Sequence, residues 1–456
     1  MTVKQLLKKQ RAGFAAGKTL ELSFRRAALL RLKAAIEQYQ PEIEKALKKD
    51  LNKSGFETYM TETGLTISAL SYTLKHLESW TRRRIVPTPL AQFPSFSFTI
   101  REPYGNVLVL APWNYPFLLA MEPLIGAIAA GNCCMVKPSE YAPHTAGVIK
   151  RIVEKALPSW LAAVVLGDKT VSEELLKHRF DYIFFTGSPS IGKEVLKRAA
   201  HNLTPVTLEL GGKSPCIIDE SANIPMAAKR IVFGKFLNGG QTCVAPDYIL
   251  VQACVKKELV RWIKYWIRKQ LGENPLLNED YPKIINRKHY TRLLNLLEGQ
   301  NLLVGGQRRE DTLQIAPVLV DEPSWDSPIM NEEIFGPILP VISIESIEEA
   351  EQIIKKGEKP LALYLFTSRK TAETCILNRV SFGGGCVNDT VIHLAGNYLP
   401  FGGVGNSGMG AYHGKHTFET FSHEKSIVKK SIHIDLPVRY QPYTKGKQKL
   451  LKFVLR

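Results

Sequence analysis

The sequence predicts an α/β protein built on parallel sheets, and two patterns support that class. Short, almost wholly apolar runs at residues 107–111, 133–136, 162–166, 182–185 and 206–210 are each followed by a turn and a stretch of helical length. Apolar strands that alternate with helices are typical of a parallel sheet covered on both faces. After residue 211 a second series begins, with helices over 223–236 and 255–270 and strands near 248–251, 315–320, 339–342 and 362–366. A chain of 456 residues has room for two such cores.

Before these series, residues 1 to about 80 predict helices that pack outside a sheet, because apolar residues recur near helical spacing opposite charged ones. Prolines at 87, 89 and 94 end this region. Residues 95–100 alternate polar and apolar side chains, which indicates a half-buried strand. That strand needs a partner, and a contact with another subunit is one candidate.

The amino-acid composition narrows the class of protein and the partners that it could bind. Hydrophobic residues make up 45% and charged residues 23%, as in ordinary soluble globular proteins. The net charge of +17 raises the question of nucleic acid, but lysines and arginines are spread along the chain and no nucleic-acid-binding motif occurs, so we expect no nucleic-acid partner. There is no secretory signal and no run of about 18 apolar residues. Seven irregularly placed cysteines suit reduced thiols in the cytoplasm.

The most informative stretch runs from Leu208 to Cys243. It opens on Leu-Glu-Leu-Gly-Gly-Lys at 208–213 and closes on Asn-Gly-Gly-Gln-Thr-Cys at 238–243. Glycines around a thiol allow backbone N–H groups of the loop to turn towards the group that the sulfur attacks. Glu209 interrupts an apolar strand, where burying a carboxylate costs free energy and therefore suggests a functional role. Cys243 and Glu209 together offer a nucleophile and a proton acceptor for covalent acyl chemistry. The other six cysteines are expected to be small core residues.

Ligands of parallel sheets lie beyond the carboxyl ends of the strands, so the residues there are candidates. Asn114 could donate to an oxyanion, or be a turn asparagine. The turn from Lys137 to Glu140 places a cation and a carboxylate on one rim, where they could bind ribose hydroxyls or be solvated. Glu333 could equally be a helix-cap or surface acid. His413 and His416 lack a third clustered ligand, so no metal site is predicted.

The segment from Gly187 to Lys193 has the GxxxxGK spacing of a phosphate-binding P-loop. A P-loop then needs Ser or Thr for magnesium, and this chain has Glu194. A helix N-terminus, with the N–H groups of Gly187 and Ser188 facing a dinucleotide pyrophosphate, is the better interpretation. An ordinary strand-to-helix turn remains an alternative, as do a P-loop phosphotransferase and a non-enzymatic structural protein as functions for the whole chain.

Seven motifs in order resemble those of the aldehyde dehydrogenase superfamily along nearly the whole chain: 112–114, 137–140, 186–188, 208–213, 238–243, 333–337 and 401–403. The short N-terminus is similar to the class 3-type enzymes. The resemblance implies a Rossmann-type cofactor domain, an α/β catalytic domain and a small oligomerisation arm. It also implies a homodimer that uses NAD or NADP to oxidise medium- or long-chain aliphatic or aromatic aldehydes to acids.

The resemblance also implies roles for individual residues. Cys243 would be the nucleophile, the Asn114 amide and the Cys243 N–H would hold the oxyanion, and Glu209 would activate water. Glu209 disfavours a CoA-acylating reaction, because relatives of that type lack this base. Glu333 would orient the nicotinamide ribose with Phe335 beside the ring, and Lys137 and Glu140 would bind the adenosine ribose. The remaining residues expected to contact the cofactor are Pro112, Trp113, Thr186, Gly187, Ser188, Gly192, Leu210 and Gly211.

By the same resemblance, residues 1–84 and 103–210 would form the dinucleotide-binding domain, 211–395 the catalytic domain, and 85–102 with 424–440 the oligomerisation arm. Residues 441–456 form a basic, amphipathic tail that is too short and too charged to span a membrane. Some relatives carry a hydrophobic anchor at this end, and this chain departs from them. Peripheral attachment of the tail to anionic lipid is a hypothesis that cosedimentation with vesicles tests.

Overall fold

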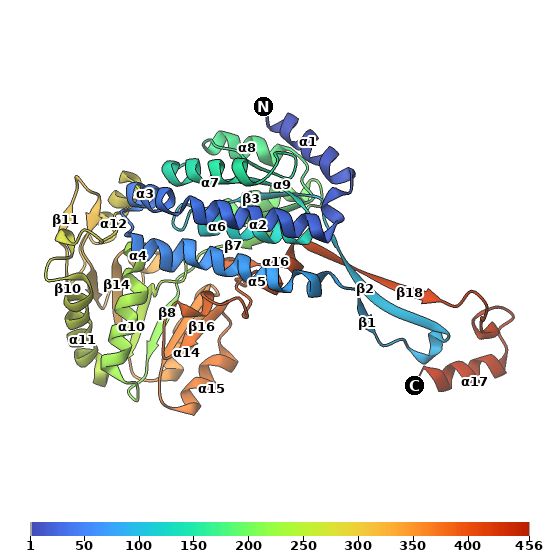
Figure 1. The fold of residues 1–456 in the computed structure, drawn as a ribbon. Coiled ribbons are helices and arrows are strands. Elements are labelled where there is room, and N and C mark those ends of the chain that lie inside the picture. The colour runs from blue at the N-terminus through green and yellow to red at the C-terminus, as the bar shows by residue number, and fades with distance from the viewer. Residues whose placement is uncertain (1, 456) are drawn as a thin grey trace.

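The computed structural model describes residues 2–455, so Met1 of the expected first domain and Arg456 of the basic tail lie outside the described residues. A body of two α/β parts carries a long arm, and the C-terminal end of the chain lies at the arm's tip (Figure 1). The α/β class predicted from the sequence is confirmed.

The first part contains a six-stranded sheet in the order β17-β7-β6-β3-β4-β5. Its strands β3 to β7 are parallel and match the five predicted apolar runs: β3 (Asn106–Leu110), β4 (Cys133–Lys137), β5 (Ala162–Val164), β6 (Tyr182–Thr186) and β7 (Val206–Glu209). The edge strand β17 (Gly408–Met409) is antiparallel to β7 and comes from the glycine-rich segment near the end of the chain.

Helices cover both faces of this sheet. The predicted N-terminal helices are confirmed, and Leu29, Leu47 and Leu70 are fully buried in the largest core. Leu7 packs on the other side, in a separate cluster with Leu108. The helices and turns of this part are α1 (Val3–Ala15), η1 (Lys18–Leu20), α2 (Leu22–Gln38), α3 (Gln40–Leu51), α4 (Gly55–Thr58), the π-helical turn η2 (Tyr59–Thr63), α5 (Gly64–Thr81), α6 (Leu118–Ala130), α7 (Pro143–Ala156), α8 (Lys169–Lys177) and α9 (Pro189–Ala200).

The second part contains a seven-stranded sheet in the order β10-β13-β14-β9-β8-β15-β16, parallel except for β10. Its strands are β8 (Pro215–Ile218), β9 (Tyr248–Gln252), β10 (Leu302–Val304), β13 (Val318–Asp321), β14 (Ile338–Ile344), β15 (Ala362–Phe366) and β16 (Gly384–Val387). The helices are α10 (Ile224–Phe236), α11 (Ala253–Leu271), α12 (Arg287–Asn295), α13 (Pro328–Asn331), α14 (Ile347–Lys356) and α15 (Lys370–Arg379).

One predicted strand of this part is wrong as a single element. Residues 315–320 divide between β12 (Gln314–Ile315), which pairs with β11 (Arg308–Arg309), and β13, which joins the large sheet. Pro317 lies between them and has no N–H to donate to a strand neighbour, so the chain changes partner there.

The arm is a three-stranded antiparallel sheet of β1 (Arg84–Val86), β2 (Ser95–Pro103) and β18 (Ser422–Lys430). The predicted strand at 95–100 therefore finds its partners in its own chain, and no second subunit is needed to pair it. The turn η3 (Leu90–Gln92) joins β1 to β2, α16 (Lys415–Thr420) leads into β18, and α17 (Lys445–Val454) follows it at the tip (Figure 1). Among residues 2–455, no helix is long and apolar enough to cross a bilayer.

Candidate active site

The thiol loop lies between α10 and β9, at the junction of the two parts. Its turn η4 (Leu237–Gly240) has three successive residues with positive φ: Asn238 at 52°, Gly239 at 63° and Gly240 at 76°. A Cβ on Gly240 would lie 2.2 Å from the Gly336 carbonyl oxygen, so only glycine allows this close approach. The loop is thus pressed against the segment that contains Glu333 and Phe335.

Cys243 is half-buried in this loop. Burial, followed by the nearby carboxylates of Glu333 and Glu209, raises the pKa of its thiol to about 12. Cys243 is therefore protonated at neutral pH in the free protein, and becomes a nucleophile only when the site favours the thiolate.

Glu209 is the last residue of β7 and is only 2% exposed. Neither of its carboxyl oxygens has a hydrogen-bond partner among the described residues, and burial raises its pKa well above the usual value. Buried polar groups are nearly always hydrogen-bonded, so an unpartnered carboxyl beside a thiol indicates a group held ready for a reactant.

Asn114 follows β3 and is buried against the thiol loop. Its side-chain Nδ2 donates to the Gln241 carbonyl (3.1 Å), and its own carbonyl accepts from Asn238 Nδ2 (2.7 Å). The next residue, Tyr115, shares a hydrogen bond with the Thr242 hydroxyl (2.6 Å). These bonds bring the end of β3 to the residues just before Cys243. The Asn114 amide has a second N–H, which leaves one donor for a ligand.

Glu333 lies across the two glycines that follow β7. The Gly212 N–H donates to its carboxylate, and a Cβ on Gly211 would lie 2.0 Å from Glu333 Oε2. Burial, and next the charge of Asp247, raises the pKa of Glu333 to about 8. Phe335 adopts a positive φ of 51° and meets the Trp113 ring edge to face at 5.3 Å. Carboxylate, glycines and aromatic rings therefore converge from both sheets.

Lys137 and Glu140 lie at the end of β4 and pair with each other, with 2.5 Å between Nζ and Oε2. Lys137 is buried and Glu140 is exposed, so the pair forms one rim of the six-stranded sheet. Pro112 and Trp113 are half-buried beyond β3, and Thr186 is the last residue of β6, with Gly187 and Ser188 after it. All of these residues lie at the carboxyl ends of parallel strands, where the sequence analysis placed them.

The GxxxxGK segment does not form a phosphate-binding loop, because Gly192 and Lys193 lie inside α9. A Cβ on Gly192 would lie 2.7 Å from Leu210 Cδ2, so this glycine lets the helix pack on the residue after Glu209. One expectation needs correction. The Gly187 N–H does not face a ligand, because it continues the β6–β7 pairing by donating to the Glu209 carbonyl oxygen (3.0 Å).

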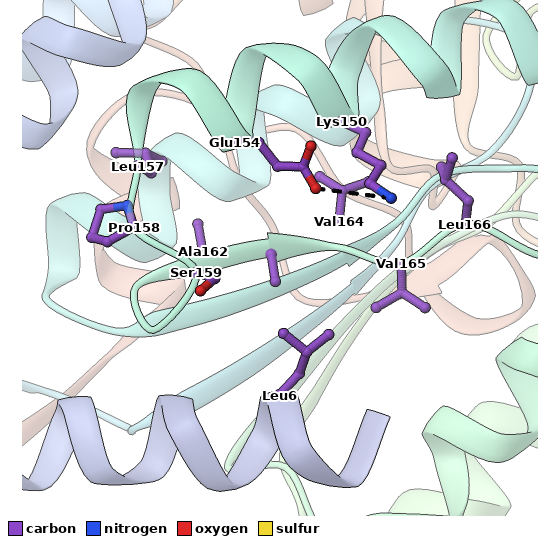
Figure 2. Close-up of a pocket in the computed structure, with 11 residues that line it drawn as sticks. Leu6, Lys150, Glu154, Leu157, Pro158, Ser159, Ala162, Val164, Val165 and Leu166 are labelled. Carbon is purple, nitrogen blue, oxygen red and sulfur yellow. Dashed lines mark ion pairs between the residues drawn. The ribbon is translucent and has the colours of Figure 1, made fainter. Parts of the chain in front are cut away.

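These residues fit a nicotinamide dinucleotide. Gly211 leaves the backbone bare where Glu333 approaches, as a close-fitting ligand site requires. The Glu333 carboxylate can accept hydrogen bonds from ribose hydroxyls, and the Lys137–Glu140 rim offers a second polar contact. A separate pocket of about 500 Å³ opens at the β5 edge, between Leu6 of α1 and the Lys150–Glu154 pair of α7, and contains none of the predicted site residues (Figure 2).

Sequence reasoning missed several residues that hold the site. Tyr115, Gln241 and Thr242 lie within or beside the quoted motifs, and the motifs themselves could have suggested them. Three charged residues behind Asn114 carried no such signal, because they resemble the surface charges of any helical region: Lys53, Glu57 and Glu62.

Comparison with known proteins agrees with this geometry. Residues 1–427 match the aldehyde dehydrogenase family. The chain is 48% identical over 452 residues to 4,4'-diaponeurosporen-aldehyde dehydrogenase of Staphylococcus aureus, covering 99% of this chain and 98% of that protein. It is 41% identical over 447 residues to aldehyde dehydrogenase family 3 member A2 of Macaca fascicularis, covering 98% and 92%.

The structure superposes on the substrate-bound state of Staphylococcus aureus AldH with a TM-score of 0.98, at 47% identity and with 100% of both chains covered. An indole-3-acetaldehyde dehydrogenase of P. syringae, solved in complex with NAD+, has a TM-score of 0.86 at 26% identity, covering 94% of this chain and 88% of that one. The expected fold is confirmed. The chain therefore belongs to the aldehyde dehydrogenase family and is an NAD(P)-dependent oxidoreductase that converts aldehydes to carboxylic acids.

Proposed function

We propose that this enzyme oxidises medium- or long-chain aliphatic or aromatic aldehydes through a covalent Cys243 thioester and releases the free acid. The observation that carries the proposal is the convergence at one junction of a thiol, an unpartnered buried carboxyl and a side-chain amide: Cys243, Glu209 and Asn114.

In the first half of the reaction, the Cys243 thiol loses its proton to water, and the thiolate sulfur forms a bond to the aldehyde carbon as the carbon–oxygen π bond breaks. The carbonyl oxygen becomes an oxyanion, which the Asn114 amide and the Cys243 backbone N–H stabilise. The bound nicotinamide cofactor supplies the hydride acceptor, and loss of hydride from that carbon leaves a thioester on Cys243. In the second half, Glu209 takes a proton from water, the water oxygen attacks the thioester carbon, and the carbon–sulfur bond breaks to release the acid.

Cofactor binding is assigned to both sheets. Glu333 and Phe335 hold the nicotinamide end, and Lys137 with Glu140 hold the adenosine ribose. Glu140 favours free ribose hydroxyls and therefore NAD, although class 3-type enzymes often accept both cofactors. In this proposal the dinucleotide-binding domain comprises 1–84 and 103–210 and the catalytic domain 211–395. The remaining residues assigned to the cofactor line the strand ends: Pro112, Trp113, Thr186, Gly187, Ser188, Gly192, Leu210 and Gly211.

The identity of 48% to an enzyme named for 4,4'-diaponeurosporen-aldehyde supports a long, apolar substrate. A panel of aliphatic aldehydes of increasing chain length, aromatic aldehydes and a long polyene aldehyde, each with NAD and with NADP, measures the preference. Higher kcat/KM for long chains than for acetaldehyde supports the proposal, and a preference for acetaldehyde contradicts it.

Cys243→Ala tests the nucleophile. We expect this variant to lose both the initial burst of reduced cofactor and the steady-state rate, because no thiohemiacetal forms. Absorbance of the reduced nicotinamide after aldehyde is added measures both phases. Cys254→Ala, at an exposed cysteine outside the proposed site residues, is the matched control and should keep both. Dehydrogenase activity that survives in Cys243→Ala would remove the thiol from the mechanism.

We also propose that the enzyme is a cytoplasmic homodimer formed through the arm, residues 85–102 and 424–440. The exposed helix α17 carries lysines beside apolar side chains such as Leu450 and Phe453, which keeps peripheral contact with anionic lipid as a hypothesis for the tail.

A further inference from the structure

A buried ion pair lies directly behind the proposed oxyanion site. Lys53 follows α3 and Glu62 lies in the π-helical turn η2, and both side chains are 0% exposed. Lys53 Nζ is 2.5 Å from Glu62 Oε1. Fully buried charges are rare and costly, and π-helical turns are frequent at functional sites, so this pair needs an explanation beyond the packing of helices.

Both partners contact the turn that carries Asn114. Lys53 Nζ is 3.4 Å from the Asn114 carbonyl oxygen and 4.2 Å from the centre of the Tyr115 ring. Glu62 Oε2 accepts from the backbone N–H groups of Phe117 (2.8 Å) and Leu118 (3.2 Å), where α6 begins. The ion pair therefore holds the start of the turn through the cation and its end through the carboxylate.

The same N-terminal segment also holds the thiol loop. Glu57 Oε1 accepts from the Asn238 N–H (2.8 Å), and Asn238 Nδ2 donates to the same Asn114 carbonyl oxygen that faces Lys53. Residues 53–62 thus contact both parts of the chain that supply oxyanion donors, the Asn114 turn and the loop that ends at Cys243.

We propose that Lys53 and Glu62 are positioning residues for the aldehyde dehydrogenase reaction, which fix the Asn114 turn so that its amide and the Cys243 N–H point at one oxyanion. The inference rests on the proposed role of Asn114. Fold stability alone is a poor explanation, because a buried ion pair is often no more stable than apolar side chains of similar volume. Precise placement of the Asn114 amide explains the buried pair better, because a displacement of about 1 Å in an active site can lower the rate about 100-fold.

Lys53→Met and Glu62→Gln test the proposal while keeping side-chain volume. We expect each to slow the burst of reduced cofactor by about 10- to 100-fold, with an unchanged Kd for NAD by fluorescence quenching. The double variant, which removes both charges, should recover part of the burst rate because no lone buried charge remains. Lys256→Met is the control: it breaks a half-buried pair with Asp321 in the second part of the chain, outside the Asn114 turn, and should leave the burst unchanged.

A double-mutant cycle with Asn114→Ala separates positioning from general damage. If Lys53 acts through Asn114, Lys53→Met slows the burst in the native background and has little further effect beside Asn114→Ala. Equal slowing in both backgrounds, or no slowing in the native one, overturns the inference. If Lys53→Met does not fold, the burst rate of Glu62→Gln is compared in the native and Asn114→Ala backgrounds in the same way. A normal burst rate in Asn114→Ala alone instead overturns the proposed oxyanion role, and the inference with it.

Discussion

Glu209 combines two properties at the scale of single residues. It is buried without a hydrogen-bond partner, and it lies close enough to Cys243 to raise the pKa of the thiol. A buried carboxyl with a raised pKa, once it is ionised, can take a proton from water, which suits the hydrolysis of a thioester. In a residue that served only the fold, burial without a hydrogen-bond partner would lower the stability of the protein.

Glu209→Gln should therefore separate the two halves of the reaction. We expect the burst of reduced cofactor to persist and the steady-state rate to fall by about 100-fold or more, because the amide cannot accept the proton. Stopped-flow absorbance with excess aldehyde measures both. Glu173→Gln, at an exposed acid on α8, serves as control. A normal steady-state rate in Glu209→Gln would exclude Glu209 as the base.

The pKa of Glu209 also sets the direction in which the rate of thioester hydrolysis changes with pH. Burial raises it well above the usual value, so the ionised base becomes more abundant as pH rises through a range above that of an ordinary glutamate. Where hydrolysis of the thioester limits turnover, the native enzyme should speed up over that range, and Glu209→Gln should lack this rise.

At the scale of elements, α6 carries the buried acid Glu122. Glu122 Oε2 is 3.6 Å from His413 Nε2, and burial raises the pKa of Glu122 to about 8 while lowering that of His413 to about 3. Both side chains are therefore neutral at pH 7. The free energy of unfolding depends on pH wherever the folded and unfolded chains bind different numbers of protons.

Between the usual glutamate pKa of about 4.5 and the folded value of about 8, the folded protein holds a proton on Glu122 that the unfolded chain releases. Rising pH through this window therefore destabilises the native protein. We expect Glu122→Gln to gain on the order of 2 kcal/mol relative to native between pH 5.5 and 7.5. Thermal midpoints of both proteins at the two pH values check the direction, and parallel midpoints would contradict it.

At the scale of the whole molecule, the arm leaves an edge exposed. β1 and β18 are the outer strands of the three-stranded sheet. Val428 of β18 is 54% exposed and Ile85 of β1 is 66% exposed. An outer strand with unpaired backbone groups and exposed apolar side chains is a surface that a second copy of the chain can cover.

Val428→Glu should weaken the proposed homodimer by placing a charge in that contact. Sedimentation velocity should show the native chain as a dimer and a shift of Val428→Glu towards monomer. Lys429→Gln is the matched control, because neighbouring strand residues point to opposite faces, and it should remain dimeric. A native chain that sediments as a monomer would remove the dimer from the proposal.

The sequence by itself determined most of the parallel strands, most helices and the residues at the strand ends, because apolar runs and glycine-rich turns are local patterns. The sequence predicted no strand at β1, β8, β10, β11, β16, β17 or β18, whose pairing depends on a neighbouring strand that supplies hydrogen bonds. Among 43 acidic residues, the pattern singled out Glu209 but not Glu62 or Glu122.

Only the tertiary structure decided which charges are buried and what they face. Lys53 and Asn114 are 61 residues apart in the chain, and Glu57 and Asn238 are 181 apart, so no local pattern records their contacts. Burial then changes the chemistry, because removing water from Cys243, Glu209 and Glu333 raises their pKa values. The reacting groups can be read from the sequence, whereas their protonation states and alignment arise from long-range packing.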